Sequence, residues 1–224
     1  MELSEAQKKL AGMIDHTLLK PDATPGAVRK ACAEALAYGF CSVAVQPSYV
    51  RLVAQELKGS PVRTCTVVGF PLGANISRVK AYEAEQAIAE GAQEIDMVLN
   101  IGALKSGDGA LVQDDMAAVV AVCHSHGVLC KVILENCYLT DVEKMEACQR
   151  AKAAGADFVK TSTGFGPGGA TVADVALMRA MVGPKMGVKA AGGIRTYAIA
   201  MEMIGAGANR IGCSASVQVI QSAG

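Results

Sequence analysis

The sequence predicts an α/β protein in which eight parallel strands close into a barrel, and three observations support this. Eight short apolar segments alternate with segments of helical character, and no linker or low-complexity stretch divides them. Hydrophobic residues make up 51% of the chain but aromatic residues only 4%, as in aliphatic helices packed on buried parallel strands. A closed barrel requires eight strands, whereas an open doubly wound sheet does not. We therefore expect one catalytic domain over residues 1–224, a single (β/α)8 TIM barrel with a short N-terminal helix.

Each predicted strand is a short run of apolar or β-branched residues that ends at a turn or at a polar residue. The strands are expected over residues 14–17, 41–45, 63–68, 94–100, 129–134, 158–161, 187–190 and 210–212.

The predicted helices are bounded by recognisable capping residues. Thr24 is a helix N-cap followed by Pro25 at the first helical position. Thr140 and Glu143 form a capping box, and Gly155 closes the helix that they open. Helices are expected over residues 1–12, 25–38, 48–58, 77–91, 108–126, 140–155, 171–182 and 196–206.

A short motif recurs three times where a helix ends and a strand begins: Gly91-Ala92-Gln93, Gly155-Ala156-Asp157 and Gly207-Ala208-Asn209. The fifth residue after each first glycine is Asp96, Lys160 and Gly212. Asp96 and Lys160 therefore occupy equivalent strand positions, and we expect both side chains to face the barrel interior.

Charged residues stand in several strands where apolar residues would pack: Asp15, Asp96, Lys131, Lys160 and Lys189. A buried cation is unfavourable unless it is paired or neutral, and a neutral lysine is a nucleophile toward carbonyl groups. Lys160 and Lys189 lie on adjacent strands, so their repulsion should drive one of them neutral. Asp96 and Asp15 supply counter-charge. A purely structural ion-pair network is the alternative interpretation.

Two glycine-rich loops follow the seventh and eighth predicted strands, around Gly192-Gly193 and around Gly212 and Ser214. In barrels of this type, loops at these two places commonly form a phosphate site with their backbone N–H groups. The sequence contains neither a P-loop nor a Gly-x-Gly-x-x-Gly segment followed by the acidic residue of a dinucleotide site.

Composition argues against several partners. Lys+Arg and Asp+Glu both number 21, so nothing indicates nucleic acid or a membrane surface. No apolar run approaches the roughly 20 residues of a membrane span. Eight scattered cysteines without a Cys-x-x-Cys pair or a signal peptide predict reduced thiols in a cytoplasmic protein. His124 and His126 have no zinc-like spacing, so we expect no metal and no cofactor.

Several of these segments together resemble the deoxyribose-phosphate aldolase family. Lys160 lies in Phe158-Val159-Lys160-Thr161-Ser162-Thr163-Gly164-Phe165, which is highly specific to that family. The resemblance extends over nearly the whole chain through residues 14–21, 68–73, 95–100, 131–135 and 188–195.

The resemblance implies a metal-free class I lyase that reversibly cleaves 2-deoxy-D-ribose 5-phosphate to D-glyceraldehyde 3-phosphate and acetaldehyde, in carbohydrate catabolism. It implies that Lys160 is the Schiff-base lysine and that Asp96 and Lys189 transfer protons, supported by Lys131 and Asp15. Its phosphate and substrate residues fall on Thr163, Gly164, Gly192, Gly193, Gly212 and Ser214. A homo-oligomer is also possible.

Two departures from the family concern phosphate binding and closure of the site. Phe165 stands where some members have a lysine, so backbone donors should contribute more to phosphate binding. The sequence ends Gln221-Ser222-Ala223-Gly224, without the C-terminal tyrosine that some members have.

Two other functions stay open from the sequence. One is a different phosphate-binding Schiff-base lyase or an isomerase, which would need a carboxylate base and a neutral histidine, and His16 is the histidine on a predicted strand. The other is a non-catalytic sugar-phosphate sensor, which would tolerate loss of the two lysines.

Overall fold

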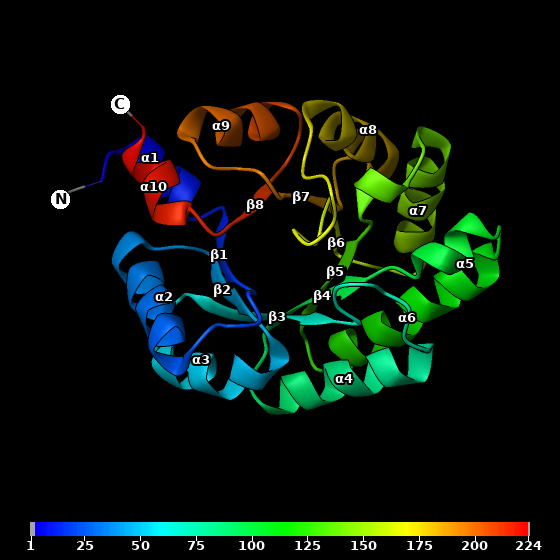
Figure 1. Cartoon of the computed structure of the whole chain (residues 1–224), viewed down its shortest axis with the longest axis horizontal. Coiled ribbons are helices and arrows are strands. Elements are labelled where there is room, and N and C mark those ends of the chain that lie inside the picture. Colours follow the sequence, from blue (N-terminus) through cyan, green and yellow to red (C-terminus); the bar gives the residue numbers. More distant parts are fainter. Residues whose placement is uncertain (1–2, 224) are drawn as a thin grey trace.

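The computed structural model describes residues 3–223, in which eight parallel strands close into a barrel in sequence order. Figure 1 shows the helices around the strands. The predicted TIM barrel is confirmed. Its strands are β1 Ile14–Leu18, β2 Ser42–Val45, β3 Arg63–Val68, β4 Glu94–Val98, β5 Leu129–Ile133, β6 Phe158–Lys160, β7 Gly187–Ala191 and β8 Arg210–Cys213.

The helices between the strands follow the predicted capping residues. Thr24 accepts a hydrogen bond from the N–H of Ala27, and Thr140 forms a complete capping box with Glu143. The α-helices are α1 Glu5–Ala11, α2 Pro25–Tyr38, α3 Val50–Glu56, α4 Ser77–Ala89, α5 Ile101–Lys105, α6 Gly109–Ser125, α7 Asp141–Ala153, α8 Val172–Val182, α9 Tyr197–Gly205 and α10 Ser216–Gln221, with 3₁₀ turns η1 Pro47–Tyr49 and η2 Asn136–Tyr138.

Two short helices, α5 and α10, were not predicted. Each spans fewer than two full turns, too few residues for a periodic pattern to show. The side chain of Asn100 caps α5, which also explains why β4 ends two residues earlier than expected. Of the predicted helix over residues 1–12, the structure shows Glu5–Ala11. Residues 1, 2 and 224 lie outside the described part of the chain.

The two faces of the strands have different chemistry. Outward residues such as Ile95, Val132 and Val188 belong to the aliphatic core between barrel and helices. Inward residues of the same strands, Asp96, Lys131 and Lys189, are charged and fully buried. Stability therefore resides mainly in the outer layer, where apolar area is removed from water.

The two ends of the described chain meet. Helices α1 and α10 lie side by side in Figure 1, and the Gln7 amide donates to the carbonyl of Ile220 at 3.0 Å. Within residues 3–223, no helix combines the length and the apolar character needed to cross a membrane.

The Thr24 cap gives a first stability prediction. Thr24→Ala should lower the free energy of unfolding by about 1 kcal/mol, because the N–H of Ala27 loses its acceptor at the start of α2. Urea denaturation measures the change, and Thr24→Ser, which keeps the hydroxyl, is the matched control. Equal losses in the two variants would contradict a capping role.

Candidate active site

The charged side chains predicted as site residues meet inside the barrel, at the middle of β4, β5 and β7 and at the carboxyl end of β6. The register places Asp96 of β4 beside Lys131 of β5, and Lys160 of β6 beside Lys189 of β7. All four are buried, and Lys160, the most exposed of them, is 3% accessible. The structure thus brings together residues that are up to 93 positions apart in the sequence.

Asp96 is the centre of this cluster. Its Oδ2 atom lies 2.9 Å from Nζ of Lys160 and 2.7 Å from Nζ of Lys189. Its Oδ1 atom lies 2.7 Å from Nζ of Lys131. One carboxylate therefore contacts three lysines from three consecutive strands.

A second tier of charges lies around this centre. Asp15 of β1 is 2.5 Å from Lys189 and 2.7 Å from Arg210, and it accepts a hydrogen bond from Ser42 at 2.7 Å. Glu94 lies 2.6 Å from Lys131 and 2.9 Å from Arg210.

Sequence analysis did not single out Glu94 and Arg210. The signal that could have found them is strand alternation, because Glu94 precedes Asp96 by two residues and Arg210 precedes Gly212 by two. Residues two apart on a strand share a face, so both of these side chains also point into the barrel.

The charges in the barrel do not balance if every group ionises. Three carboxylates, Asp15, Glu94 and Asp96, face four cationic side chains, Lys131, Lys160, Lys189 and Arg210. The thiol of Cys65 also lies here, and burial raises its pKa to about 12, so it adds no negative charge. Neutralising one lysine brings the buried set to zero net charge.

Of the three lysines, Lys160 is the one whose pKa is lowered, so it is the one that loses its proton most readily. Burial lowers its pKa, and nearby Lys189 lowers it further, against the opposing effect of Asp96. Burial also disfavours the charged form of Lys189, but Asp15 and Asp96 raise the pKa of Lys189 above its usual value. Burial likewise disfavours the charged form of Lys131, but Asp96 and Glu94 outweigh burial and raise its pKa.

The three carboxyl groups stay ionised in spite of burial. Burial favours the protonated form of Asp96, but Lys131 and Lys189 hold its pKa well below the usual range. The pKa of Glu94 is lowered, mainly by Lys131 and Arg210 acting against burial. The pKa of Asp15 is lowered too.

Gly212, which corresponds to Asp96 and Lys160 in the third copy of the repeated motif, leaves space for this cluster. A Cβ atom on Gly212 would lie 3.0 Å from Cε of Lys189 and 3.1 Å from Cβ of Ala191. Gly212 therefore faces the same interior as Asp96 and Lys160, and its missing side chain gives Lys189 its space.

A cavity of about 350 Å³ opens over Lys160. All six residues predicted to bind phosphate or substrate line it: Thr163, Gly164, Gly192, Gly193, Gly212 and Ser214. Phe165 also lines it, with its ring edge-on to that of Phe70 at 5.3 Å.

The rim of this cavity offers groups suited to an anion. None of the N–H groups of Gly164, Gly192, Gly193 and Ser214 donates to a backbone carbonyl within residues 3–223. The cationic side chains of Lys20 and Arg195 also line the cavity, and sequence analysis had not named them as site residues.

The expectation that no metal-ligand cluster would form is wrong in one respect. Asp15, Cys65 and Glu94 place ligand-type atoms within 4.8 Å of one another. The ammonium group of Lys131 already lies among them, 2.6 Å from Glu94, 3.5 Å from Cys65 and 3.9 Å from Asp15. A lysine thus takes the position that a metal ion would need. The sequence could not show this, because the residues come from separate strands.

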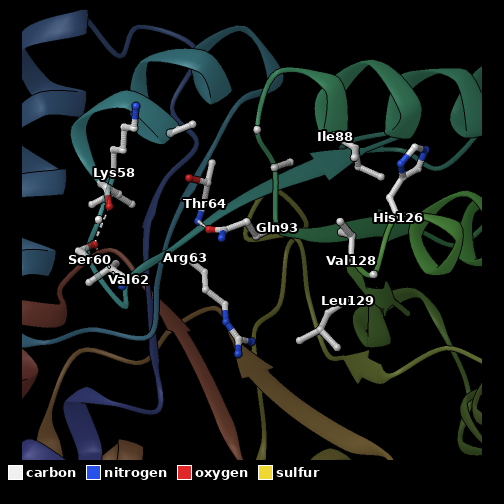
Figure 2. Close-up of a pocket in the computed structure, with 16 residues that line it drawn as sticks. Lys58, Ser60, Val62, Arg63, Thr64, Ile88, Gln93, His126, Val128 and Leu129 are labelled. Carbon is white, nitrogen blue, oxygen red and sulfur yellow. Dashed lines mark hydrogen bonds between the residues drawn. The ribbon is translucent and has the colours of Figure 1, made fainter.

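A wider hollow, of about 880 Å³, lies at the opposite end of the barrel. Figure 2 shows it near the first residues of β3 and β5, with Arg63, Gln93 and Leu129 among its lining residues. It contains none of the predicted site residues. The smaller cavity is therefore the candidate site, because it alone of these two reaches Lys160.

His16 lies apart from the lysine cluster. Its Nδ1 atom is 2.9 Å from the hydroxyl of Ser216, and its Nε2 atom is 2.9 Å from Glu34 of α2. Burial lowers the pKa of His16, although Glu34 opposes the shift. His16 is thus a neutral histidine that joins β1 to α2 and α10.

Comparison with known proteins identifies relatives over nearly the whole chain. A model of the DeoC/LacD family of aldolases matches residues 10–220. The deoxyribose-phosphate aldolase of Caldanaerobacter subterraneus is 56% identical, over 99% of this chain and 96% of its own length. That of Thermococcus kodakarensis is also 56% identical, over 97% and 98%. The solved tetrameric deoxyribose phosphate aldolase of Aeropyrum pernix superposes with a TM-score of 0.91 at 37% identity, covering 96% of this chain and 91% of that one.

Removing one cation tests the charge balance of the barrel. Lys131→Met should lower the free energy of unfolding by roughly 3–5 kcal/mol at pH 7, because Asp96 and Glu94 lose a buried partner. Urea denaturation measures this loss. Lys30→Met, in which an exposed lysine is replaced, is the control and should unfold like the wild type.

The loss should also depend on pH. In the wild type, folding lowers the pKa values of Glu94 and Asp96. Their ionised forms therefore stabilise the fold above pH ~4, and this stabilisation is lost as the pH falls through the pKa values of the folded state. Without Lys131 those pKa values rise, and the variant takes up protons on acidification. The difference in the free energy of unfolding between Lys131→Met and the wild type should therefore narrow from pH 7 to pH 4. A gap of constant size would contradict ionised carboxylates at these positions.

Proposed function

The chain belongs to the DeoC/LacD family of aldolases, and we propose that it cleaves 2-deoxy-D-ribose 5-phosphate reversibly to D-glyceraldehyde 3-phosphate and acetaldehyde through a Schiff base on Lys160. One observation carries the proposal. Lys160 is a buried lysine with a lowered pKa, and it lines a cavity that is also lined by glycines whose N–H groups donate to no backbone carbonyl within residues 3–223. A neutral amine is the form that attacks a carbonyl group.

The chemistry begins when the Lys160 amine adds to the C1 aldehyde of the open-chain sugar. The carbinolamine loses water and becomes an iminium ion, which draws electrons toward C1. The C2–C3 bond then breaks, its electron pair forms the enamine, and the C3 hydroxyl loses its proton as glyceraldehyde 3-phosphate departs. Protonation of the enamine at C2 and hydrolysis of the iminium release acetaldehyde and the free amine.

Asp96 and Lys189 are the groups suited to move these protons. They are 2.7 Å apart, and Asp96 also lies 2.9 Å from Lys160. Because the carboxylate stays ionised and Lys189 stays cationic, one can accept a proton and the other donate, through a water molecule. Lys131 and Asp15 support this pair by holding Asp96 and Lys189 in place.

The phosphate group fits the glycine-rich end of the cavity. Backbone N–H groups of Gly164, Gly192, Gly193 and Ser214 can donate to its oxygens, and Lys20 and Arg195 add positive charge. Phe165 provides no charge, which supports a larger share for the backbone donors.

An isomerase and a sugar-phosphate sensor account for the site less well. An isomerase would need a neutral histidine and a carboxylate base at the cavity, but His16 and its partner Glu34 do not line the cavity over Lys160. A sugar-phosphate sensor would have no use for a buried lysine of lowered pKa, whose burial gains little stability.

We also propose self-association, supported by the tetrameric relative from Aeropyrum pernix. A cytoplasmic location and a role in deoxyribonucleotide catabolism stay predictions.

Chemical trapping tests the proposal at Lys160. Acetaldehyde with borohydride should place a reduced two-carbon adduct on Lys160, because borohydride reduces the iminium; peptide mass spectrometry locates it. Lys160→Arg should lose both the label and the release of glyceraldehyde 3-phosphate from deoxyribose 5-phosphate in a coupled assay, with ribose 5-phosphate as control substrate. Equal labelling of Lys160→Arg would sink the assignment.

Replacing Lys189 tests the electrostatic part of the proposal. Lys189→Leu should raise the pKa of Lys160, since it removes a cation that lowers that pKa and frees Asp96 to attract the ammonium form. Trapping should then require a higher pH, because the fraction of neutral amine falls about tenfold when the pKa rises by one. Turnover should recover less than trapping as pH rises, because proton transfer is also impaired.

Asp96→Asn is the matched control, because its trapping profile should shift along the pH axis in the opposite direction. Asp96 is the largest influence that raises the pKa of Lys160, so its loss should move the trapping profile to lower pH. An unshifted profile in Lys189→Leu would mean that Lys189 serves in proton transfer alone.

A further inference from the structure

We propose that Glu135 is a positioning residue that holds the loop after β6 in the shape needed to bind the substrate phosphate. This inference rests on the proposed function, because it assigns a role within the same site. Glu135 follows β5 and does not line the cavity, so it acts through the loop residues that do.

The backbone of Glu135 is in a conformation that only a compensating interaction maintains. Its φ is 55°, and every other positive φ within residues 3–223 belongs to a glycine. A left-handed conformation costs a non-glycine residue on the order of 1 kcal/mol or more, and such residues cluster at functional sites. The contacts that surround Glu135 therefore have to compensate for this conformational cost.

The side chain of Glu135 is buried, with 2% exposure, and both of its oxygens contact Thr163. The N–H of Thr163 donates to Oε1 at 3.1 Å, and the hydroxyl of Thr163 donates to Oε2. The same hydroxyl accepts a hydrogen bond from the N–H of Phe165 at 3.0 Å. One carboxylate thus fixes both ends of the turn Thr163-Gly164-Phe165.

Glycine at position 166 lets the loop lie against this carboxylate. A Cβ atom there would come within 3.2 Å of Cδ of Glu135 and 3.0 Å of Sγ of Cys137. The loop therefore packs directly on Glu135, and its path is set by that contact.

The contact between Glu135 and Thr163 determines which groups of the turn face the cavity. Both donors of Thr163 face Glu135, so Thr163 contributes to phosphate binding by orienting its neighbours. Gly164, with φ 88°, is exposed at the rim, and Phe165 is held against Phe70. Loss of the contact between Glu135 and Thr163 should therefore weaken phosphate binding. Lys160 is held by Asp96 and should keep its reactivity toward the carbonyl group.

The experiment compares a phosphorylated and an unphosphorylated substrate in Glu135 variants of the full-length protein. Glu135→Gly removes the carboxylate and suits the left-handed backbone, so it should fold. Glu135→Gln keeps an acceptor for the Thr163 N–H and is the conservative rescue.

We expect KM for deoxyribose 5-phosphate to rise about tenfold in Glu135→Gly, with kcat changed less than about threefold. Glu135→Gln should recover most of the loss. For unphosphorylated deoxyribose, kcat/KM should stay within about twofold, and the inhibition constant of inorganic phosphate should rise in parallel with KM. The double variant with Thr163→Val should be no worse than its worse single variant, because both remove one contact.

Three outcomes would overturn the inference. The first two are an equal loss for both sugars and an unchanged inhibition constant for phosphate. The third is a fall in acetaldehyde trapping at Lys160 as large as the rise in KM, since Glu135 would then act on the lysine or on the whole fold. The ratio between the two sugars does not depend on which residue forms the Schiff base. Failure of trapping in the wild-type protein would therefore count against the proposed function and leave this test of Glu135 standing.

Discussion

The contact between Asp96 and three lysines is the interaction on which the rest of the site depends. Asp96, together with Glu94 at Lys131 and with Asp15 at Lys189, keeps both of these lysines cationic in the barrel. Those charges make a third buried ammonium group unfavourable, so the lysine with the least compensation, Lys160, carries the lowered pKa. Asp96 itself raises the pKa of Lys160. Burial and the charge of Lys189 together outweigh this effect and lower the pKa, which makes Lys160 a better nucleophile. Reactivity at Lys160 is thus a property of the whole charged set.

The barrel can hold this set because its stability comes from elsewhere. A buried ion-pair network contributes little more to stability than apolar packing would, and a broken one is strongly destabilising. The outward faces of the same strands are aliphatic and pack on the helices, so most of the favourable free energy of folding comes from this outer layer. Asp15, Glu94 and Arg210 complete the pairing of the cluster but line no part of the cavity over Lys160.

Sequence reasoning succeeded where a local pattern fixes a residue's position. Strand count gave the barrel, and the recurring glycine motif placed Asp96 and Lys160 on one interior face. It missed Glu94 and Arg210 because a charged residue at the start of a strand is common at a protein surface, and only the closed barrel buries it. Glu135 was missed for another reason: its left-handed backbone and its contact with Thr163 depend on how β5 and β6 lie side by side.

The glycine at the third copy of the motif shows how space limits the chemistry of the barrel. Lys189 extends across the interior to reach both Asp15 and Asp96, and its stem passes over β8 where a Cβ of residue 212 would be 3.0 Å away. The same constraint recurs one layer below, where a Cβ on Gly187 would lie 2.1 Å from the ring of Phe158, on which Arg210 rests at 5.4 Å. Long cationic side chains can fill a narrow barrel only if neighbouring strands supply no side chain at the crossing points. Equivalent positions on β4, β6 and β8 therefore hold a carboxylate, a nucleophilic lysine and a glycine that has no side chain. The glycine is as necessary to the cluster as the two charged residues.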